Sequence, residues 1–149
     1  MIDDESELQS AIKNAAIKLL ARREYSRAEL WNKLSGKFSQ KHLVNQVLDQ
    51  LAADNYQSDE RFAEAFIQFK KNQGKGKTLI RFELKNKGIS EQLIEALLDE
   101  ADEDWFEIAK SVYEKKFSGR PIDTPKEKAK RIRFMSSRGF STDHIFSLL

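Results

Sequence analysis

The sequence predicts an all-α fold, an elongated, curved array of three tandem three-helix repeats that each resemble a helix-turn-helix unit. Three observations predict it. Apolar residues recur at helical spacing nearly throughout, no segment alternates apolar and polar residues as a half-buried strand does, and one pattern returns after 51 residues. Charged residues make up 34% of the 149 positions, with only 2 prolines and 6 glycines, a composition typical of long solvated helices.

Helix starts are marked by capping residues. Ser26 with Glu29 fits a capping box, in which hydroxyl and carboxylate satisfy the free backbone donors of the first turn. Ser6 with Gln9 fits the same pattern, and Thr124 is followed by proline at the first helical position. We expect helices to begin just after these serines and threonine.

Helix ends are marked by glycines, which favour the left-handed backbone that often follows a helix. Gly36, Gly88 and Gly139 are expected to stop helices in this way. Together with the apolar spacing, these signals predict nine helices, near residues 7–23, 27–35, 39–53, 58–72, 77–87, 90–102, 103–118, 125–138 and 141–149.

A repeat organises these helices. Ser39, Ser90 and Ser141 are separated by 51 residues each, and each is expected to cap the third helix of a repeat. The same spacing relates three further columns, Phe38 with Ile89 and Phe140, Leu43 with Ile94 and Ile145, and Val47 with Leu98 and Leu149. Four columns in register predict repeats at 1–54, 55–102 and 103–149 in one continuous array, a form that generally binds extended partners.

Composition excludes several classes of protein. The chain has no cysteine, so a disulfide framework, a thiol nucleophile and a cysteine-based zinc site are impossible. No apolar run approaches the roughly 20 residues that a membrane helix needs. The acidic start at 1–5 is the reverse of a signal peptide. We expect a cytoplasmic, monomeric protein without a membrane association.

One segment resembles a phosphate loop. Gly76, Lys77 and Thr78 match the last three positions of that motif, but Lys71 stands where its first glycine belongs. The preceding segment is an amphipathic helix and not the required strand. A basic turn between two helices is therefore the favoured interpretation over nucleotide binding.

Metal and catalytic sites are also disfavoured. His42 and His144 are 102 residues apart without neighbouring ligands, and are interpreted as helix-surface or first-turn residues. The acidic segment 99–104 lacks the regular alternation and the glycine of a calcium loop, so a solvated junction or an acidic docking patch fits it better. No nucleophile and base stand in a recognisable arrangement. We expect a protein that is not an enzyme and needs no cofactor.

Charge is unevenly distributed although the net charge is only +2. Residues 70–87 carry seven bases and one acid, whereas 91–107 carry eight acids and no base. In the helix after Gly76, Lys77, Arg81 and Lys85 recur every four residues and form one stripe, while Leu79, Phe82 and Ile80 are expected to face the core. A basic stripe suits phosphate backbones or an acidic protein groove, and an ordinary solvated helix face is the alternative.

The motifs resemble those of the RecX family, regulatory proteins that modulate the bacterial RecA recombinase. They are LARREYSRAEL at 20–30, YQSDERFA at 56–63, RFEL at 81–84 with KGI at 87–89, and RGFS at 138–141. Their order and spacing cover the chain from about residue 11 to its end. Asn55 and Gln57 depart from the glycine and leucine common in the family, and asparagine tolerates the left-handed backbone at a helix end. Leu30, Leu34, Phe62, Ala63, Leu84 and Phe140 are expected in the core.

The resemblance implies three tandem three-helix units that bind in the groove of the RecA–DNA filament. It also implies control, by inhibition, of the filament's recombinase, ATPase and coprotease activities. The rival interpretation is a helical DNA-binding module that holds the phosphate backbone of single- or double-stranded DNA. For either partner, the candidate binding residues are Arg22, Arg23, Lys70, Lys71, Lys75, Lys77, Arg81, Lys85 and Lys87.

Overall fold

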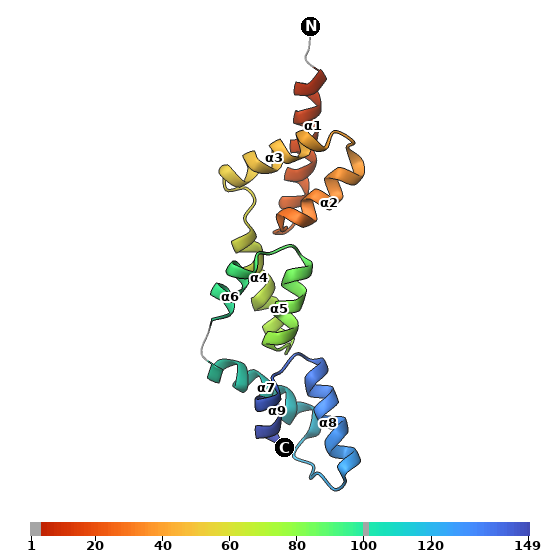
Figure 1. Ribbon diagram of the computed structural model, residues 1–149, viewed down its shortest axis with the longest axis vertical. Helices are drawn as coiled ribbons and strands as arrows, with labels where there is room; N and C mark the ends of the chain where they lie inside the picture. The colour runs from red at the N-terminus through yellow and green to blue at the C-terminus, as the bar shows by residue number, and fades with distance from the viewer. Residues whose placement is uncertain (1–3, 100–101) are drawn as a thin grey trace. The chain divides into compact units, whose positions relative to one another are not determined.

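The computed structural model describes residues 4–99 and 102–149, and this part of the chain contains nine α-helices and no strand (Figure 1). The all-α prediction is therefore confirmed. The helices are α1 (Asp4–Leu20), α2 (Arg27–Lys37), α3 (Lys41–Ala53), α4 (Asp59–Asn72), α5 (Lys77–Asn86), α6 (Glu91–Leu98), α7 (Asp102–Phe117), α8 (Pro125–Ser137) and α9 (Thr142–Leu148).

The chain divides into two compact units. The first comprises Met1–Ala65 and Lys87–Ser90, and the second comprises Phe66–Asn86 and Glu91–Leu149. The first unit therefore holds α1, α2, α3 and the beginning of α4, together with the turn that follows α5. The second holds the rest of α4 and the helices from α5 to α9. Among the described residues no helix is long and apolar enough to cross a membrane.

The core of the first unit lies among α1, α2 and α3, because each helix turns an apolar face inward. Ile12 and Ala16 of α1 meet Leu30 and Leu34 of α2, and the long apolar face of α3 closes the cluster. The buried residues of α3 are Leu43, Val44, Val47, Leu48 and Leu51, which are at most 1% exposed. The predicted core positions Leu30, Leu34, Phe62 and Ala63 are all buried, as expected.

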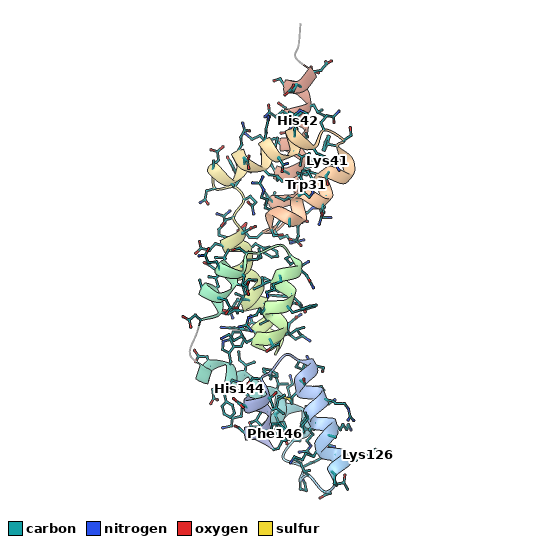
Figure 2. The ribbon with its side chains drawn as sticks, viewed as in Figure 1. Trp31, Lys41, His42, Lys126, His144 and Phe146 are labelled. Carbon is teal, nitrogen blue, oxygen red and sulfur yellow. The ribbon has the colours of Figure 1, made fainter. Side chains whose placement is uncertain are left out.

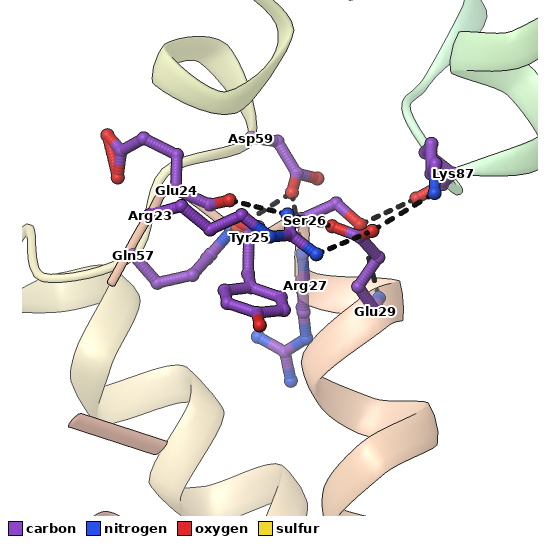
Figure 3. Close-up of polar contacts among 9 residues, drawn as sticks. All are labelled: Arg23, Glu24, Tyr25, Ser26, Arg27, Glu29, Gln57, Asp59 and Lys87. Carbon is purple, nitrogen blue, oxygen red and sulfur yellow. Dashed lines mark hydrogen bonds and ion pairs between the residues drawn. The ribbon is translucent and has the colours of Figure 1, made fainter. Parts of the chain in front are cut away.

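The start of α2 carries the predicted capping box and makes a further contact (Figure 3). The Ser26 hydroxyl accepts from the Glu29 N–H, and the Glu29 carboxylate accepts from the Ser26 N–H, both at 3.1 Å. The same hydroxyl donates to the Lys87 carbonyl at 2.8 Å. Gly88 follows with φ +80°, and a Cβ there would lie 2.4 Å from the Ala28 Cβ. Ser26 thus caps α2 and holds the turn after α5.

The polar groups buried near the start of α2 are hydrogen-bonded. Gln57 is 4% exposed, and its amide donates to the Tyr25 carbonyl at 3.3 Å and to the Asp59 carboxylate at 3.0 Å. Gln57 therefore replaces a leucine without leaving its amide N–H groups unsatisfied. Asn55 has φ +63°, the left-handed conformation that asparagine was expected to tolerate here.

Three of the residues expected to mark helix boundaries, Ser6, Gly36 and Ser39, do not mark them. The first described helical residue of α1 is Asp4, so Ser6 lies inside the helix and not at its cap. Helix α2 continues through Gly36 to Lys37, since Gly36 keeps a helical conformation and lies in open space. Helix α3 begins after Gln40, whose side chain makes no capping bond, so Ser39 lies one residue too early.

In the second unit, α7, α8 and α9 enclose a core of Ala109, Met135, Phe140 and Ile145. Leu84 of α5 is fully buried, so the last two predicted core positions, Leu84 and Phe140, are also confirmed. The cap of α8 is the predicted Thr124, whose hydroxyl accepts from the Glu127 N–H at 3.1 Å. The Glu127 carboxylate does not complete a capping box there and instead accepts from Arg131 at 3.0 Å.

Arg131 is a charged side chain inside this unit, 2% exposed. Besides Glu127, it donates to the Tyr113 hydroxyl at 2.8 Å and to the carbonyl of Arg120 at 3.0 Å. Its guanidinium also lies 4.6 Å from the centre of the Phe117 ring. The hydrogen bonds with Tyr113 and Glu127 raise the pKa of Arg131, so the buried group stays charged and ties the α7–α8 loop to α8.

The start of α5 contacts the turn between α8 and α9. The Gly76 N–H donates to the Arg138 carbonyl at 2.7 Å, and the Thr78 N–H donates to the Gly139 carbonyl at 3.1 Å. A Cβ on Gly76 would lie 2.4 Å from the Gly139 carbonyl group, so the backbones approach closely. Gly139 has φ +97°, and a Cβ there would lie 2.4 Å from that of Leu79. The N–H groups of Gly76 and Thr78 are therefore bonded to carbonyl groups. This agrees with the interpretation of 74–78 as a turn between two helices and not as a phosphate loop.

Candidate partner-binding grooves

The first unit carries an open groove of about 520 Å³ between α1 and α2. Its floor is aliphatic, formed by Ala15, Leu19 and Leu34. Among the described residues, four cations and no acid complete its lining, Lys18 and Arg22 on one side and Lys33 and Lys37 on the other. All four are exposed, so the groove combines an apolar floor with an uncompensated positive rim.

The second unit carries an open groove of about 660 Å³ between the end of α4, α7 and α8. Its apolar lining is Ile108, Val112 and Phe134, and Glu107 is the acid among the described residues that line it. The cations are Lys71, Lys115, Lys116 and Arg138. Two of them cover an aromatic floor, because Lys116 and Arg138 lie 5.1 and 5.2 Å from the centre of the Phe134 ring.

The two grooves occupy the same place in their repeats, between the first and second helix. Lining residues of the first helix and the turn after it have one spacing in both, Ala15, Lys18, Leu19 and Arg22 against Ile108, Ser111, Val112 and Lys115. Lining residues at the end of the second helix are four apart in both, Lys33 with Lys37 and Phe134 with Arg138, which directly follows α8. We name them the α1–α2 groove and the α7–α8 groove.

Ion pairs between described residues engage Arg23, Lys87, Lys70, Arg81 and Lys85 among the nine cations selected from the sequence. The pairs are Arg23 with Glu29 at 3.4 Å, Lys87 with Glu29 at 3.2 Å, Lys70 with Glu83 at 3.0 Å, Arg81 with Glu95 at 2.6 Å and Lys85 with Glu91 at 3.6 Å. Arg23 also lies 3.6 Å from the centre of the Tyr25 ring. Arg23 and Lys87 thus belong to the contact shown in Figure 3 and serve the scaffold.

The α5 stripe is partly neutralised by α6. Two guanidinium nitrogens of Arg81 donate to the two oxygens of Glu95, at 2.6 and 3.3 Å. The Arg81 hydrogen bond and the nearby charge of Lys77 and Lys85 hold the pKa of Glu95 below its ordinary value. The stripe therefore presents less free charge than its sequence indicates.

The expected orientation of α5 needs a correction. Ile80 is fully buried, but Phe82 is 62% exposed and does not face the core. Two residues along a helix turn it by about 200°, so Phe82 lies opposite the buried pair Ile80 and Leu84. The Phe82 ring is therefore exposed, on the same helix as the exposed Lys85.

The remaining selected cations lie in or near the grooves. Arg22 lines the α1–α2 groove, and Lys71 lines the α7–α8 groove with its ammonium 4.7 Å from the Trp105 ring centre. Lys75 and Lys77 make no ion pair with any described residue and are half-buried. Sequence reasoning missed six groove cations, Lys18, Lys33, Lys37, Lys115, Lys116 and Arg138. Lys18 with Arg22, and Lys33 with Lys37, are four residues apart, which is the helical spacing of side chains on one face. This signal could have identified Lys18, Lys33 and Lys37.

The histidines lie in first turns, as expected (Figure 2). His42 is exposed at the start of α3, whereas His144 is buried in α9 and packs edge-on against Phe106 with ring centres 5.5 Å apart. His144 is therefore not a surface residue. Within residues 4–99 and 102–149, no three histidine or acidic side chains are grouped to hold a metal ion. Of the acidic segment 99–104, residues 100 and 101 and the side chains of residues 102 and 103 lie outside the described part of the chain.

The fold and the grooves define an all-helical protein of three-helix repeats. Three family models match the chain, described as the first, second and third three-helix domains of RecX, over residues 13–51, 58–98 and 102–149. The chain therefore belongs to the RecX family, and the resemblance seen in its motifs is confirmed.

Curated relatives agree over nearly the whole length. Regulatory protein RecX of Pseudomonas putida (strain GB-1) is 38% identical over 139 residues, covering 93% of this chain and 89% of the relative. Regulatory protein RecX of Actinobacillus pleuropneumoniae serotype 5b (strain L20) is 41% identical over 137 residues, 91% of this chain and 89% of the relative. These relatives are regulatory proteins, and the similarity supports a regulatory role for this chain.

Solved structures share the fold. The crystal structure of RecX from Lactobacillus salivarius superposes with a TM-score of 0.83 over 96% of this chain and 95% of that chain, at 23% sequence identity. A further crystal structure of regulatory protein RecX gives the same TM-score over 99% of this chain and 78% of its own, at 20% identity.

Proposed function

We propose that this protein binds the RecA–DNA filament and lowers its recombinase, ATPase and coprotease activities. Its role is to occupy a surface of the filament, not to catalyse a reaction, and it acts in the cytoplasm as a monomer without a cofactor. The repeats, bounded at 1–54, 55–102 and 103–149, each contribute to that surface. Membership of the RecX family is the observation that carries the proposal.

The grooves supply a physical basis for partner binding. Both the α1–α2 groove and the α7–α8 groove expose cations around an apolar floor. Such surfaces attract an acidic partner and then bury apolar area against it, which gives both rapid association and a stable contact. The selected residues that contribute here are Arg22 and Lys71, while Lys75 and Lys77 extend the positive surface.

A direct DNA contact is the second candidate function, and Phe82 is the observation that favours it. Its ring is 62% exposed on the same helix as Lys77, Arg81 and Lys85. Exposed aromatic rings among cations stack on unpaired bases while the cations hold phosphates. A low net charge of +2 argues against DNA as the main partner.

The test is a titration of purified protein into RecA assembled on single-stranded DNA, with ATP hydrolysis and strand exchange as readouts. We expect both activities to fall as the protein approaches stoichiometric amounts. Unchanged hydrolysis and unchanged strand exchange at that ratio would sink the proposal. The double variant Lys77→Glu with Phe82→Ala tests the direct DNA contact. If the variant no longer binds bare DNA but still lowers ATP hydrolysis by RecA, the DNA contact is secondary to filament binding.

A further inference from the structure

The middle repeat differs from its neighbours at one position of the groove. Leu84 corresponds to Leu34 and Met135, so Glu83 occupies the position of Lys33 in the first repeat and Phe134 in the third. Lys70 lies near the end of α4, the first helix of the middle repeat. In this repeat a lysine of the first helix and an acid of the second helix therefore face each other.

That acid pairs with a lysine of its own repeat. The Glu83 carboxylate lies 3.0 Å from the Lys70 ammonium, and both side chains are mostly covered, at 27% and 21% exposure. The Lys70 ammonium lies 5.4 Å from the Phe66 ring centre, so an apolar surface lies beside the pair. The middle repeat therefore supplies its own acid and its own apolar neighbour to Lys70.

We propose that the α1–α2 groove and the α7–α8 groove are equivalent docking sites, each for an acidic amphipathic helical segment of a partner protein. In each, a partner carboxylate takes the place that Glu83 holds in the middle repeat. Apolar side chains of the same segment cover Leu19 and Leu34 in one groove, and Val112 and Phe134 in the other. A helix with acids on one edge and aliphatic residues on its inner face meets both requirements.

The floors favour a protein segment over nucleic acid. Phosphate contacts need cations but gain nothing from an aliphatic floor such as Ala15, Leu19 and Leu34. Unpaired bases need an open aromatic face, and the α1–α2 groove is lined by no aromatic residue. In the α7–α8 groove the Phe134 ring is already covered by Lys116 and Arg138. Charge and floor together therefore select an acidic, partly apolar peptide.

This inference rests on the proposed function only because both take the partner to be a protein. Peptide binding is measured without RecA, so the two are tested separately. The probe is a short fluorescein-labelled peptide with glutamate along one helix face and leucine along the other, titrated against the full chain. Anisotropy gives affinity and calorimetry gives stoichiometry. We expect two peptides per chain and no comparable binding of a scrambled peptide of the same composition.

Charge-reversal variants locate the sites. Lys33→Glu with Lys37→Glu is expected to weaken one site about tenfold, and Lys115→Glu with Lys116→Glu the other. Matched controls carry the same charge change outside the grooves, Lys13→Glu with Lys41→Glu, and Lys126→Glu with Lys128→Glu. Figure 2 labels Lys41 on α3 and Lys126 on α8. The controls are expected to bind within about twofold of the unmodified chain.

The middle repeat gives a gain-of-binding test. Glu83→Lys places a lysine where the first repeat has Lys33 and frees Lys70, so a third peptide is expected per chain. Equal binding by groove and control variants would overturn the proposal. So would oligo-thymidine binding that the groove variants abolish while the peptide fails to bind, because the grooves would then hold nucleic acid. A chain that binds two peptides yet leaves RecA hydrolysis unchanged keeps the groove sites and loses the proposed function.

Discussion

Two contacts in this molecule share a geometry and differ in chemistry. In each, the start of a repeat's second helix meets the glycine turn that follows the second helix of the next repeat. In the first unit the contact is made by a side chain, because the Ser26 hydroxyl donates to the Lys87 carbonyl and Glu29 binds the Lys87 ammonium. Gly88 leaves room there for Ala28.

In the second unit the corresponding contact uses backbone alone. The Gly76 N–H donates to the carbonyl of Arg138, and Leu79 lies against Gly139. The receiving turns keep their glycine 51 residues apart, while the donor changes from a hydroxyl to an N–H. The repeat therefore preserves the glycine turn after the second helix. The start of the preceding repeat's second helix can vary, provided that one hydrogen-bond donor there binds a carbonyl of that turn.

The largest expected effect is that of Gly139→Ala. The new Cβ would lie 2.4 Å from that of Leu79, and alanine is strained at φ +97°. We expect the free energy of unfolding to fall by about 3–5 kcal/mol, from backbone strain and overpacking together. Urea denaturation followed by circular dichroism measures it. A loss below about 1 kcal/mol, the ordinary cost of a surface change, would show that the close approach is not required.

A smaller effect is expected from Ser26→Ala, which removes a helix cap and the donor to Lys87. We predict a loss of about 2 kcal/mol in the free energy of unfolding. Thr124→Ala is the matched control, because its hydroxyl caps α8 and makes no second contact among the described residues. That control should cost about 1 kcal/mol. Equal losses in the two variants would deny the Ser26 hydroxyl a role beyond capping.

The polar contact also predicts a pH dependence that the backbone contact lacks. Burial alone would raise the pKa of Glu29, but hydrogen bonds from the Ser26 N–H, Arg23 and Lys87 outweigh it and lower the pKa below 4.5. Since the folded-state pKa lies below that of the unfolded chain, this stabilisation is complete above the unfolded pKa. It is lost as pH falls through the folded value.

Glu29→Gln tests this dependence. At pH 7 the variant should unfold at a lower temperature than the unmodified chain, and the difference should narrow as pH falls below 4.5. Glu64→Gln, at an exposed position of α4, serves as the control and should show a small, constant difference. A gap between Glu29→Gln and the unmodified chain that widens in acid would reverse the sign of the argument.

The smallest expected effect is a gain in stability from Gly36→Ala. Gly36 does not act as Gly88 and Gly139 do, because it lies within α2 and a Cβ added there would meet nothing within 4 Å. Alanine should stabilise the helix by roughly 0.5–1 kcal/mol. Thermal unfolding measures the change, and a clear loss would indicate that Gly36 receives a contact as Gly88 and Gly139 do.

Much of the fold was predictable because it follows from local spacing. The 3.6-residue period places Leu43, Val47 and Leu51 on one face, and the capping residues Ser26 and Thr124 fix two helix starts. Gly36 misled because glycine tolerates a helix as well as a turn, and only the surroundings decide between them. Phe82 does not follow the prediction because an apolar residue is not necessarily a buried one.

The site was less predictable, because it depends on which helices come together. The acids that neutralise α5 lie on α6, so Arg81 looks free in the sequence and is paired with Glu95 in the structure. The grooves need residues from two helices, such as Lys18 and Lys33, whose juxtaposition no single segment reveals. Their equivalence becomes visible only when the lining residues of both repeats are compared.

We propose above that this chain recognises an assembled protein filament. The most direct test of this proposal is binding to fluorescent single-stranded DNA, with and without RecA and a non-hydrolysable ATP analogue, at near-physiological salt. Binding that appears only with the assembled filament is the predicted result, and it should weaken in the groove variants. Equal and strongly salt-sensitive binding to bare DNA would contradict filament recognition and favour a nucleic-acid module.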